Sequence, residues 1–448
     1  MSDLYTTTAL TDCRRVAERL RHEGFAHDEA YEKASLFASA SALLPPMNDP
    51  VAAFVPGRVE VLGKHTDYAG GRSMVACVER GFCVVAGART DGLFRIMDAS
   101  RGEEVSFAIG PELTPTSGHW SNYPMTVARR VSRSFGQLRG LDLAFASDLP
   151  PAAGMSSSSA LMIGCFIAMA SINQLQQHPE YVRNIGSRED LAGYLAAVEN
   201  GQSFGALAGD SGVGTFGGSE DHTAILCCRA GQIAQYSYCP LRFERSIDMP
   251  GGYTFAIGIS GVAAEKTGQA MERYNRASRL ARAAVERWNA ATGRSDPYLA
   301  AAVHSSADAQ DRLRAILRDD SPLLDRFEQF VAESEQVMPS AADALAKGDV
   351  ASLGTIVDRS QRLAETLLGN QVPETVFLAK SARELGAAAS SAFGAGFGGS
   401  VWAMIEAGSA PGFLHAWSRR YRNAFPQAAA HSAFLLTRPG PSAFRLAG

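Results

Sequence analysis

Residues 150–160 read Pro-Pro-Ala-Ala-Gly-Met-Ser-Ser-Ser-Ser-Ala, and a largely apolar run from Leu161 to Ile172 follows them. A short apolar segment at 141–146 precedes them and has the composition of a strand. A strand, a loop of small residues and a helix form, in that order, a site that can hold phosphate. The free N–H groups at the helix start point outward, and the helix dipole attracts anions.

This stretch therefore predicts a phosphate-binding loop, although serines that only cap a helix are the simpler alternative. Serine hydroxyls can also hold a magnesium ion that bridges phosphates. The predicted phosphate-facing residues are Gly154, Ser156, Ser157, Ser158 and Ser159. No Gly-Lys-Ser/Thr follows, which excludes a Walker A loop, and the spacing is not that of a dinucleotide-binding fingerprint.

A second glycine-rich stretch, Ser-Ala-Phe-Gly-Ala-Gly-Phe-Gly-Gly-Ser, occupies residues 391–400 and leads into a predicted strand at 400–405. Its glycines, among them Gly396 and Gly398, permit positive φ angles and a close approach of the backbone to a ligand. An ordinary tight turn is the alternative for either stretch alone. Two such loops in one chain favour a shared nucleotide site.

Composition excludes several other classes of function. The 448 residues carry 42 Lys and Arg against 46 Asp and Glu, a net charge of −4, with no basic block that would indicate nucleic acid or an anionic membrane as a partner. The apolar run is about half as long as a bilayer crossing requires. Seven irregularly spaced cysteines favour reduced thiols, and we expect a cytoplasmic protein.

The order of predicted elements favours an α+β fold. Helical spacing covers 12–42, 188–199, 263–290, 298–318, 322–346 and 350–367, and strands are predicted at 52–62, 77–86, 141–146, 400–405 and 433–436. Helices and strands do not alternate regularly, which argues against a doubly wound sheet. Residues 201–218 are rich in glycine, alanine and serine, and we interpret them as a flexible connection or an active-site loop.

A third segment allows a comparison with a known family. Residues 56–68 read Pro-Gly-Arg-Val-Glu-Val-Leu-Gly-Lys-His-Thr-Asp-Tyr. Together with the two loops, they resemble the three motifs of the GHMP kinase superfamily, and this segment is similar to the galactokinase signature Gly-Arg-x-Asn-x-x-Gly-Glu-His-x-Asp-Tyr. Trp120-Ser-Asn122-Tyr123 resembles a Trp-x-Asn-Tyr element of the sugar-type members.

The resemblance implies a two-domain α+β fold with its active site in the interdomain cleft, and we predict domains at 1–225 and 226–448. It also implies ATP and Mg²⁺, and transfer of the γ-phosphoryl group to a sugar hydroxyl, which in galactokinases is the anomeric 1-OH. The expected partner is a small sugar, and we expect a monomer or a weak homo-oligomer.

The resemblance also implies roles for single residues. Residues 217–222, Gly-Gly-Ser-Glu-Asp-His, are similar to the family segment that carries the catalytic aspartate, so Asp221 would be the base and Arg58 its cationic partner. The family usually has Met-Asp-Gln there, which makes Glu220 and His222 departures. Glu199 and Ser158 would hold the metal. His65, Asp67 and Tyr274 would bind the sugar.

Two further departures concern the substrate. Lys64 replaces a glutamate that accepts the sugar's primary hydroxyl in galactokinases, and Glu60 replaces an asparagine. One interpretation pairs Glu60 with Lys64 and keeps a neutral hexose as substrate. The other places Lys64 against a C6 carboxylate and predicts a uronic acid such as glucuronate or galacturonate. A buried lysine beside a neutral ligand is costly unless Glu60 supplies the countercharge.

Two other classes of function compete with a sugar kinase. A sugar- and ATP-binding regulator could keep the fold without catalysis, but Arg58, Asp221 and the serine loop are all present. A kinase for a non-sugar acceptor, as in the mevalonate or homoserine branches, is disfavoured by His65-Thr-Asp67-Tyr68 and by the Trp120–Tyr123 element. Sequence analysis therefore favours an ATP-dependent sugar kinase.

Overall fold

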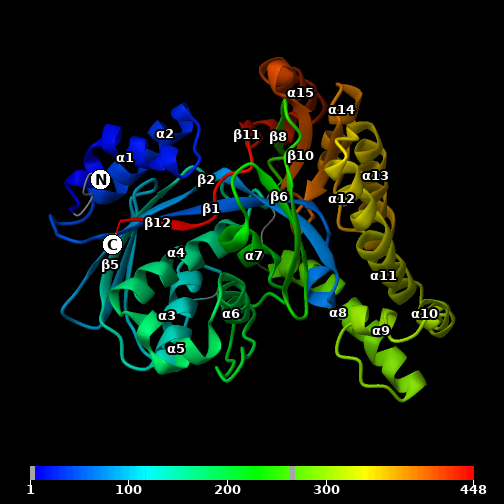
Figure 1. Ribbon diagram of the computed structural model, residues 1–448, viewed down its shortest axis with the longest axis horizontal. Helices are drawn as coiled ribbons and strands as arrows, with labels where there is room; N and C mark the ends of the chain where they lie inside the picture. Colours follow the sequence, from blue (N-terminus) through cyan, green and yellow to red (C-terminus); the bar gives the residue numbers. More distant parts are fainter. Residues whose placement is uncertain (1–5, 117, 263–267, 448) are drawn as a thin grey trace.

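The computed structural model describes residues 6–116, 118–262 and 268–447, which fold around two β-sheets (Figure 1). The larger sheet has eight strands in the order β12-β1-β2-β5-β3-β4, with β6 and β7 attached through β2. Its strands are β1 (Val51–Leu62), β2 (Arg72–Ala88), β3 (Leu93–Asp98), β4 (Glu103–Ala108), β5 (Leu141–Ser147), β6 (Gln232–Ser237), β7 (Arg242–Asp248) and β12 (Phe444–Ala447).

The smaller sheet is entirely antiparallel, in the order β11-β8-β10-β9. Its strands are β8 (Tyr253–Ile259), β9 (Ala389–Phe393), β10 (Ser400–Glu406) and β11 (Ala433–Thr437). The predicted strands at 52–62, 141–146, 400–405 and 433–436 are therefore confirmed, and the strand predicted at 77–86 lies inside the longer β2. Mixed helices and strands in this order confirm the α+β class.

Helices cover both faces of the large sheet (Figure 1). On one face lie α1 (Cys13–His22) and α2 (His27–Ser41), and α2 contacts β2 and β5. On the other lie α3 (Asn122–Phe135), α4 (Ser157–Ile172), α5 (Pro179–Asn184) and α6 (Arg188–Asn200). The apolar run of α4 is buried nearly all round because α4 contacts β1, β2, α3 and α7 (Glu220–Cys227). The prediction of a buried helix is confirmed.

A long helical arm follows the smaller sheet's first strand in the chain (Figure 1). It comprises α8 (Gly268–Thr292), α9 (Leu299–Val303), α10 (Ala309–Leu317), α11 (Ser321–Val331), α12 (Met338–Ala346) and α13 (Val350–Leu363). Two π-helical turns, Ala332–Val337 and Ala364–Leu368, follow α11 and α13. The helix predicted over 298–318 is broken between α9 and α10, and residues 263–267 of the one predicted over 263–290 lie outside the described residues.

The remaining helices, α14 (Pro373–Glu384), α15 (Ala410–Ala424) and α16 (Pro426–Ala429), belong to the region of the smaller sheet. The predicted division at residue 225 stays a prediction. Three strands that follow it in sequence, β6, β7 and β12, lie in the large sheet, so the sheets do not separate at that residue.

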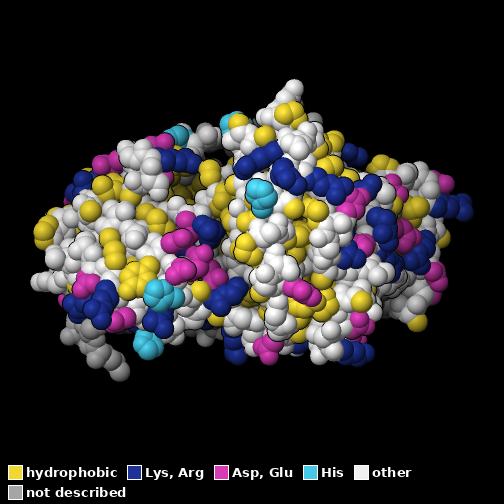
Figure 2. All heavy atoms as spheres, turned by 90° about the horizontal axis from the view of Figure 1, so that it is seen from above, with side chains coloured by type: hydrophobic (Ala, Val, Ile, Leu, Met, Phe, Trp, Pro, Cys, Tyr) yellow, Lys and Arg dark blue, Asp and Glu magenta, His cyan; other side chains and the backbone are white. Residues whose placement is uncertain are grey.

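The visible surface carries no segregated charge. Figure 2 shows acidic and basic side chains interspersed over the face it presents, in keeping with a net charge of −4. Within the described ranges, none of the helices combines the length and apolar character needed to span a bilayer. All seven cysteines are free thiols.

Candidate active site

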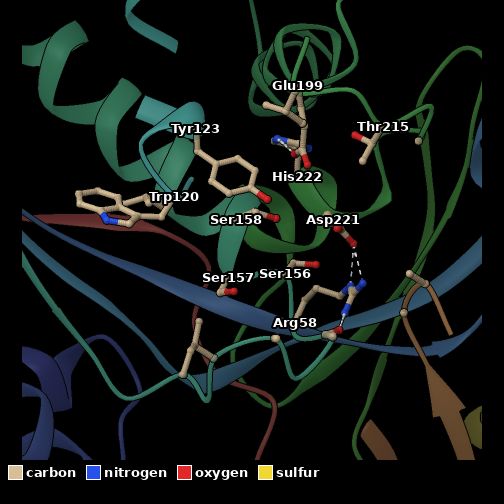
Figure 3. Close-up of a pocket in the computed structure, with 18 of the residues that line it drawn as sticks. Arg58, Trp120, Tyr123, Ser156, Ser157, Ser158, Glu199, Thr215, Asp221 and His222 are labelled. Carbon is tan, nitrogen blue, oxygen red and sulfur yellow. Dashed lines mark hydrogen bonds and ion pairs between the residues drawn. The ribbon is translucent and has the colours of Figure 1, made fainter. Parts of the chain in front are cut away.

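A cavity of about 640 Å³ lies where the two sheets approach each other, and it collects residues from distant parts of the chain (Figure 3). Its lining includes Arg58 and Glu60 of β1, the serine loop before α4, and Asp221 of α7. Gly394 and Ala395, from the loop between β9 and β10, complete it. The two small-residue loops identified from sequence therefore meet at one cavity.

The first loop joins β5 to α4 and adopts a tight conformation. Gly154 has φ +73° and Ser156, at the N-cap of α4, has φ +59°. The hydroxyl of Ser156 is buried and has no hydrogen-bond partner among the described residues. Ser157 and Ser158, in the first turn of α4, also line the cavity. An unsatisfied donor at a helix N-terminus fits an anionic group such as phosphate.

The fourth serine of this loop has a different position. Ser159 is fully buried and does not line the cavity, and its hydroxyl donates a hydrogen bond of 2.8 Å to Glu199 Oε2. Glu199, near the end of α6, does line the cavity. Ser159 therefore orients the carboxylate that was predicted from sequence to bind the metal, and Ser158 lines the cavity together with Ser156 and Ser157.

The second loop lies directly against the first. The hydroxyl of Ser400 donates a hydrogen bond of 2.5 Å to the carbonyl oxygen of Ala153. A Cβ added at Gly394 would lie 2.9 Å from the carbonyl oxygen of Gly154, so the approach requires glycine. Gly396 and Gly398, predicted to bind the nucleotide, are not among the lining residues. Cβ atoms there would meet Asn370 and Val262 instead.

Arg58 connects the serine loop to the predicted catalytic aspartate (Figure 3). Its Nε and Nη2 each lie 2.8 Å from Asp221 Oδ1, and its Nη1 donates to the carbonyl oxygen of Gly154 at 2.6 Å. Burial opposes the charge of Arg58, but Asp221, then Glu220 and Glu60, outweigh it and raise the pKa of Arg58. Asp221 lies in the first turn of α7.

The loop after β1 presents two of the residues expected to bind sugar. His65 Nε2 donates to the carbonyl oxygen of Ala395 at 3.0 Å, and Nδ1 lies 3.0 Å from the Tyr68 hydroxyl. Asp67 Oδ2 accepts a hydrogen bond of 3.1 Å from the Glu220 N–H. His65 and Asp67 both line the cavity. Tyr274 belongs to α8, but its side chain lies outside the described residues.

Lys64 does not face the cavity. Its side chain is 1% exposed, and its ammonium group donates to the hydroxyls of Ser360 on α13 at 3.1 Å and Ser391 on β9 at 2.8 Å. Ser360 in turn donates to Glu333 Oε1 at 2.9 Å. Lys64 therefore holds the loop after β1, which carries His65 and Asp67, against the helical arm. In this orientation its ammonium group does not reach a sugar in the cavity, so it gives no support to a C6 carboxylate on the substrate.

Glu60, unlike Lys64, has its ionisable group at the cavity. It is 4% exposed and lines the cavity, and its Oε1 has no hydrogen-bond partner within the described part of the chain. Burial raises the pKa of Glu60 from 4.5 to about 7, and the charges of Lys64 and Arg58 limit the rise. Burial, Glu60 and Asp67 raise the pKa of Glu220 as well. The predicted pairing of Glu60 with Lys64 is thus electrostatic, without an ion-pair contact between these two described residues.

This raised pKa predicts how stability depends on pH. Between about pH 4.5 and 7 the folded protein keeps a proton on Glu60 that the unfolded chain releases, so the free energy of unfolding falls as pH rises through that window. Glu60→Gln should flatten this slope and raise stability at pH 8. Urea denaturation of both proteins at pH 5 and pH 8 measures it, and an unchanged slope would show that Glu60 does not carry the proton.

Several other residues line the cavity, and of these only Trp120 had been singled out from the sequence. Phe82, Trp120, Phe145 and Leu161 form an apolar end, and Figure 3 shows Trp120 and Arg58 on opposite sides of the serine loop. Asn200 Oδ1 accepts a hydrogen bond of 2.9 Å from the Gly217 N–H and so shapes the loop before α7. Glu220, noted from sequence only as a departure from the family segment, also lines the cavity.

Comparison with known proteins agrees with this geometry. The family model for the galactokinase galactose-binding signature matches residues 46–88, and those for the GHMP kinase N-terminal and C-terminal domains match 122–210 and 341–423. Galactokinases from Roseiflexus sp. (strain RS-1) and Chloroflexus aggregans are each 28% identical, over 82% of this chain and 87% and 86% of their own lengths.

Solved structures share the fold. Galactokinase of Lactococcus lactis, complexed with galactose, superposes with a TM-score of 0.73 at 20% identity, covering 88% of this chain and 95% of that one. Mevalonate kinase of Methanococcus jannaschii gives 0.54 at 11% identity, covering 86% and 97%. The chain belongs to the GHMP kinase superfamily. Within it, the chain is an ATP-dependent sugar kinase of the galactokinase type.

Proposed function

We propose that this kinase transfers the γ-phosphoryl group of ATP to the anomeric 1-hydroxyl of a neutral hexose, with galactose as the leading candidate. The observation that carries the proposal is the Arg58–Asp221 pair, at 2.8 Å, beside the phosphate loop and the His65–Asp67 segment in a single cavity. The curated relatives of similar length are galactokinases, and the L. lactis structure contains galactose.

Asp221 would accept the proton of the attacking hydroxyl, because its carboxylate lines the same cavity as His65 and Asp67, the residues expected to bind the sugar. Arg58 would hold this carboxylate and stabilise the negative charge that develops on the oxygens during transfer. The Gly154–Ser158 backbone and the Ser156 hydroxyl would bind phosphate oxygens. The apolar end with Trp120 suits the adenine ring.

Ser158 and Glu199 would hold Mg²⁺, a role for which a hydroxyl and a carboxylate oxygen are suitable ligands. The buried Ser156 hydroxyl, with no described partner, fits a site that receives a charged phosphate group. When bound, the ion neutralises charge on the β- and γ-phosphates. The protein's contribution is to keep the carboxylate in place, through the hydrogen bond from Ser159 to Glu199.

The charges around the acceptor end favour a neutral sugar over a uronate. Glu60, Asp67, Glu220 and Asp221 line the cavity around Arg58, whose guanidinium already lies 2.8 Å from the Asp221 carboxylate. An acceptor carboxylate would meet repulsion from the Asp221 carboxylate, to which Glu60 and Glu220, with their raised pKa values, add as they lose their protons. Lys64, the cation on which a uronic-acid 1-kinase would depend, donates to Ser360 and Ser391 instead.

A substrate panel tests the proposal. We expect ADP release with galactose, weaker release with N-acetylgalactosamine, and none above background with glucuronate or galacturonate. Galactose and galacturonate form a matched pair, because they differ only at C6, where galactose has a neutral hydroxymethyl group and galacturonate has a carboxylate. Turnover of galacturonate with no turnover of galactose would reverse the assignment. Binding of ATP and galactose without ADP release would instead indicate a regulator that binds sugar and ATP but does not catalyse phosphoryl transfer.

A further inference from the structure

His222 lies beside the carboxylate that we assign to the metal ion. Its Nε2 is 3.3 Å from Glu199 Oε2, and the two side chains are 2% and 5% exposed. Glu199 comes from the end of α6 and His222 from the first turn of α7, and both line the cavity. Figure 3 shows the pair above Ser158, on the side of the cavity that faces the serine loop.

This spacing suits two ligands of one ion. Neighbouring ligands of an octahedral ion with bonds of about 2.1 Å lie about 3.0 Å apart. The observed 3.3 Å needs only a small adjustment to reach that value. The hydroxyl of Ser159 donates to the same Glu199 oxygen at 2.8 Å and fixes its position. The imidazole therefore lies where a further ligand would be, next to Glu199 and in the cavity that Ser158 also lines.

We propose that His222 is a nitrogen ligand of the catalytic metal ion, so that this kinase prefers Mn²⁺ or Co²⁺ to Mg²⁺. The inference rests on the proposed function, which places the metal at Ser158 and Glu199. Mg²⁺ favours oxygen ligands, whereas an imidazole nitrogen shifts affinity toward the later first-row ions. The glutamine that similar kinases usually have at this position would offer an oxygen instead.

Another group of acids shows why the Glu199–His222 pair is the better candidate. Glu29, Glu32 and Asp148 also lie close enough to one another to share an ion. However, the Lys33 ammonium group lies 2.8 Å from Glu29 and 2.5 Å from Asp148, and it is fully buried between them. That group is neutralised by its own lysine. At Glu199 the neighbouring group is instead the His222 imidazole, which can itself bind a metal ion.

Electron spin-echo spectroscopy of bound Mn²⁺ tests the assignment on the wild-type protein. With [¹⁵N]histidine incorporated and an ATP analogue present, the spectrum should show a directly coupled ¹⁵N in place of the ¹⁴N of unlabelled protein. Absence of a histidine nitrogen coupling would overturn the proposal and leave His222 as a residue that merely orients Glu199. Because this readout needs no turnover, it stands even if the sugar kinase assignment fails.

The variant His222→Gln provides the matched comparison. We expect the nitrogen coupling to disappear and the ratio of Mn²⁺ to Mg²⁺ affinity, measured by titration, to fall about tenfold or more. An unchanged ratio would contradict the proposal. If the variant does not fold, the labelled wild-type spectrum still decides. A wild-type protein that shows the nitrogen coupling but has no kinase activity with either ion would count against the proposed function alone.

Discussion

Asp221→Asn should reduce turnover by about 10²–10⁴-fold while the affinity for ATP stays nearly unchanged. The amide keeps the size of the side chain and can still contact Arg58, whose guanidinium lies 2.8 Å from Asp221 Oδ1. It cannot accept the proton of the attacking hydroxyl. Steady-state ADP release and ATP binding by calorimetry measure the two quantities separately.

Asp91→Asn is the control for this prediction. Asp91 pairs with Arg89 at 2.7 Å outside the cavity, and its replacement should leave turnover unchanged. If the Asp221 variant retained turnover within a few fold of the wild type, another group would have to accept the proton. The raised pKa of Glu220, next in sequence, would make that residue the first to examine.

Lys64→Glu, which restores the residue typical of the galactokinase signature, should lower the free energy of unfolding by about 3–5 kcal/mol. Lys64 is buried against Ser360 and Ser391, and its charge acts on Glu60. A carboxylate there would join the buried Glu60 and Glu333 and would remove the ammonium charge that, with Arg58, offsets the burial of Glu60. Urea denaturation measures the loss.

Lys64→Met separates the effect of charge from that of volume. It removes the cation but adds no acid, so its destabilisation should be smaller than that of Lys64→Glu. A Lys64→Glu protein as stable as the wild type, with a lower KM for galactose, would mean that residue 64 reaches the sugar. The orientation described for Lys64 would then be wrong.

Local sequence was sufficient to predict the parts of the site that depend on local structure. The small residues before Leu161 predicted the serine loop, because strand, loop and buried helix are all encoded within about thirty consecutive residues. Resemblance predicted that Arg58 and Asp221 act together, and the structure brings them into contact. Their roles in catalysis stay predictions.

The side-chain orientations could not be predicted, because they depend on residues far away in the chain. Lys64 turns toward Ser360 and Ser391, roughly 300 positions later, and no pattern near residue 64 encodes those partners. Gly396 and Gly398 were predicted to bind the nucleotide from the glycine content of their loop, but they pack closely against Asn370 and Val262 instead. Likewise, α7 begins at Glu220, just after the glycine-rich residues 201–218 that were interpreted as a loop, so no sequence pattern indicated that Asp221 lies in a helix.

Product analysis after incubation with ATP and galactose tests the central claim most directly. Phosphorus NMR should show one sugar 1-phosphate formed for each ADP released, as expected if Asp221 activates the anomeric hydroxyl beside the phosphate loop. Release of inorganic phosphate without any sugar phosphate, or phosphate on another hydroxyl, would contradict the account of the acceptor site.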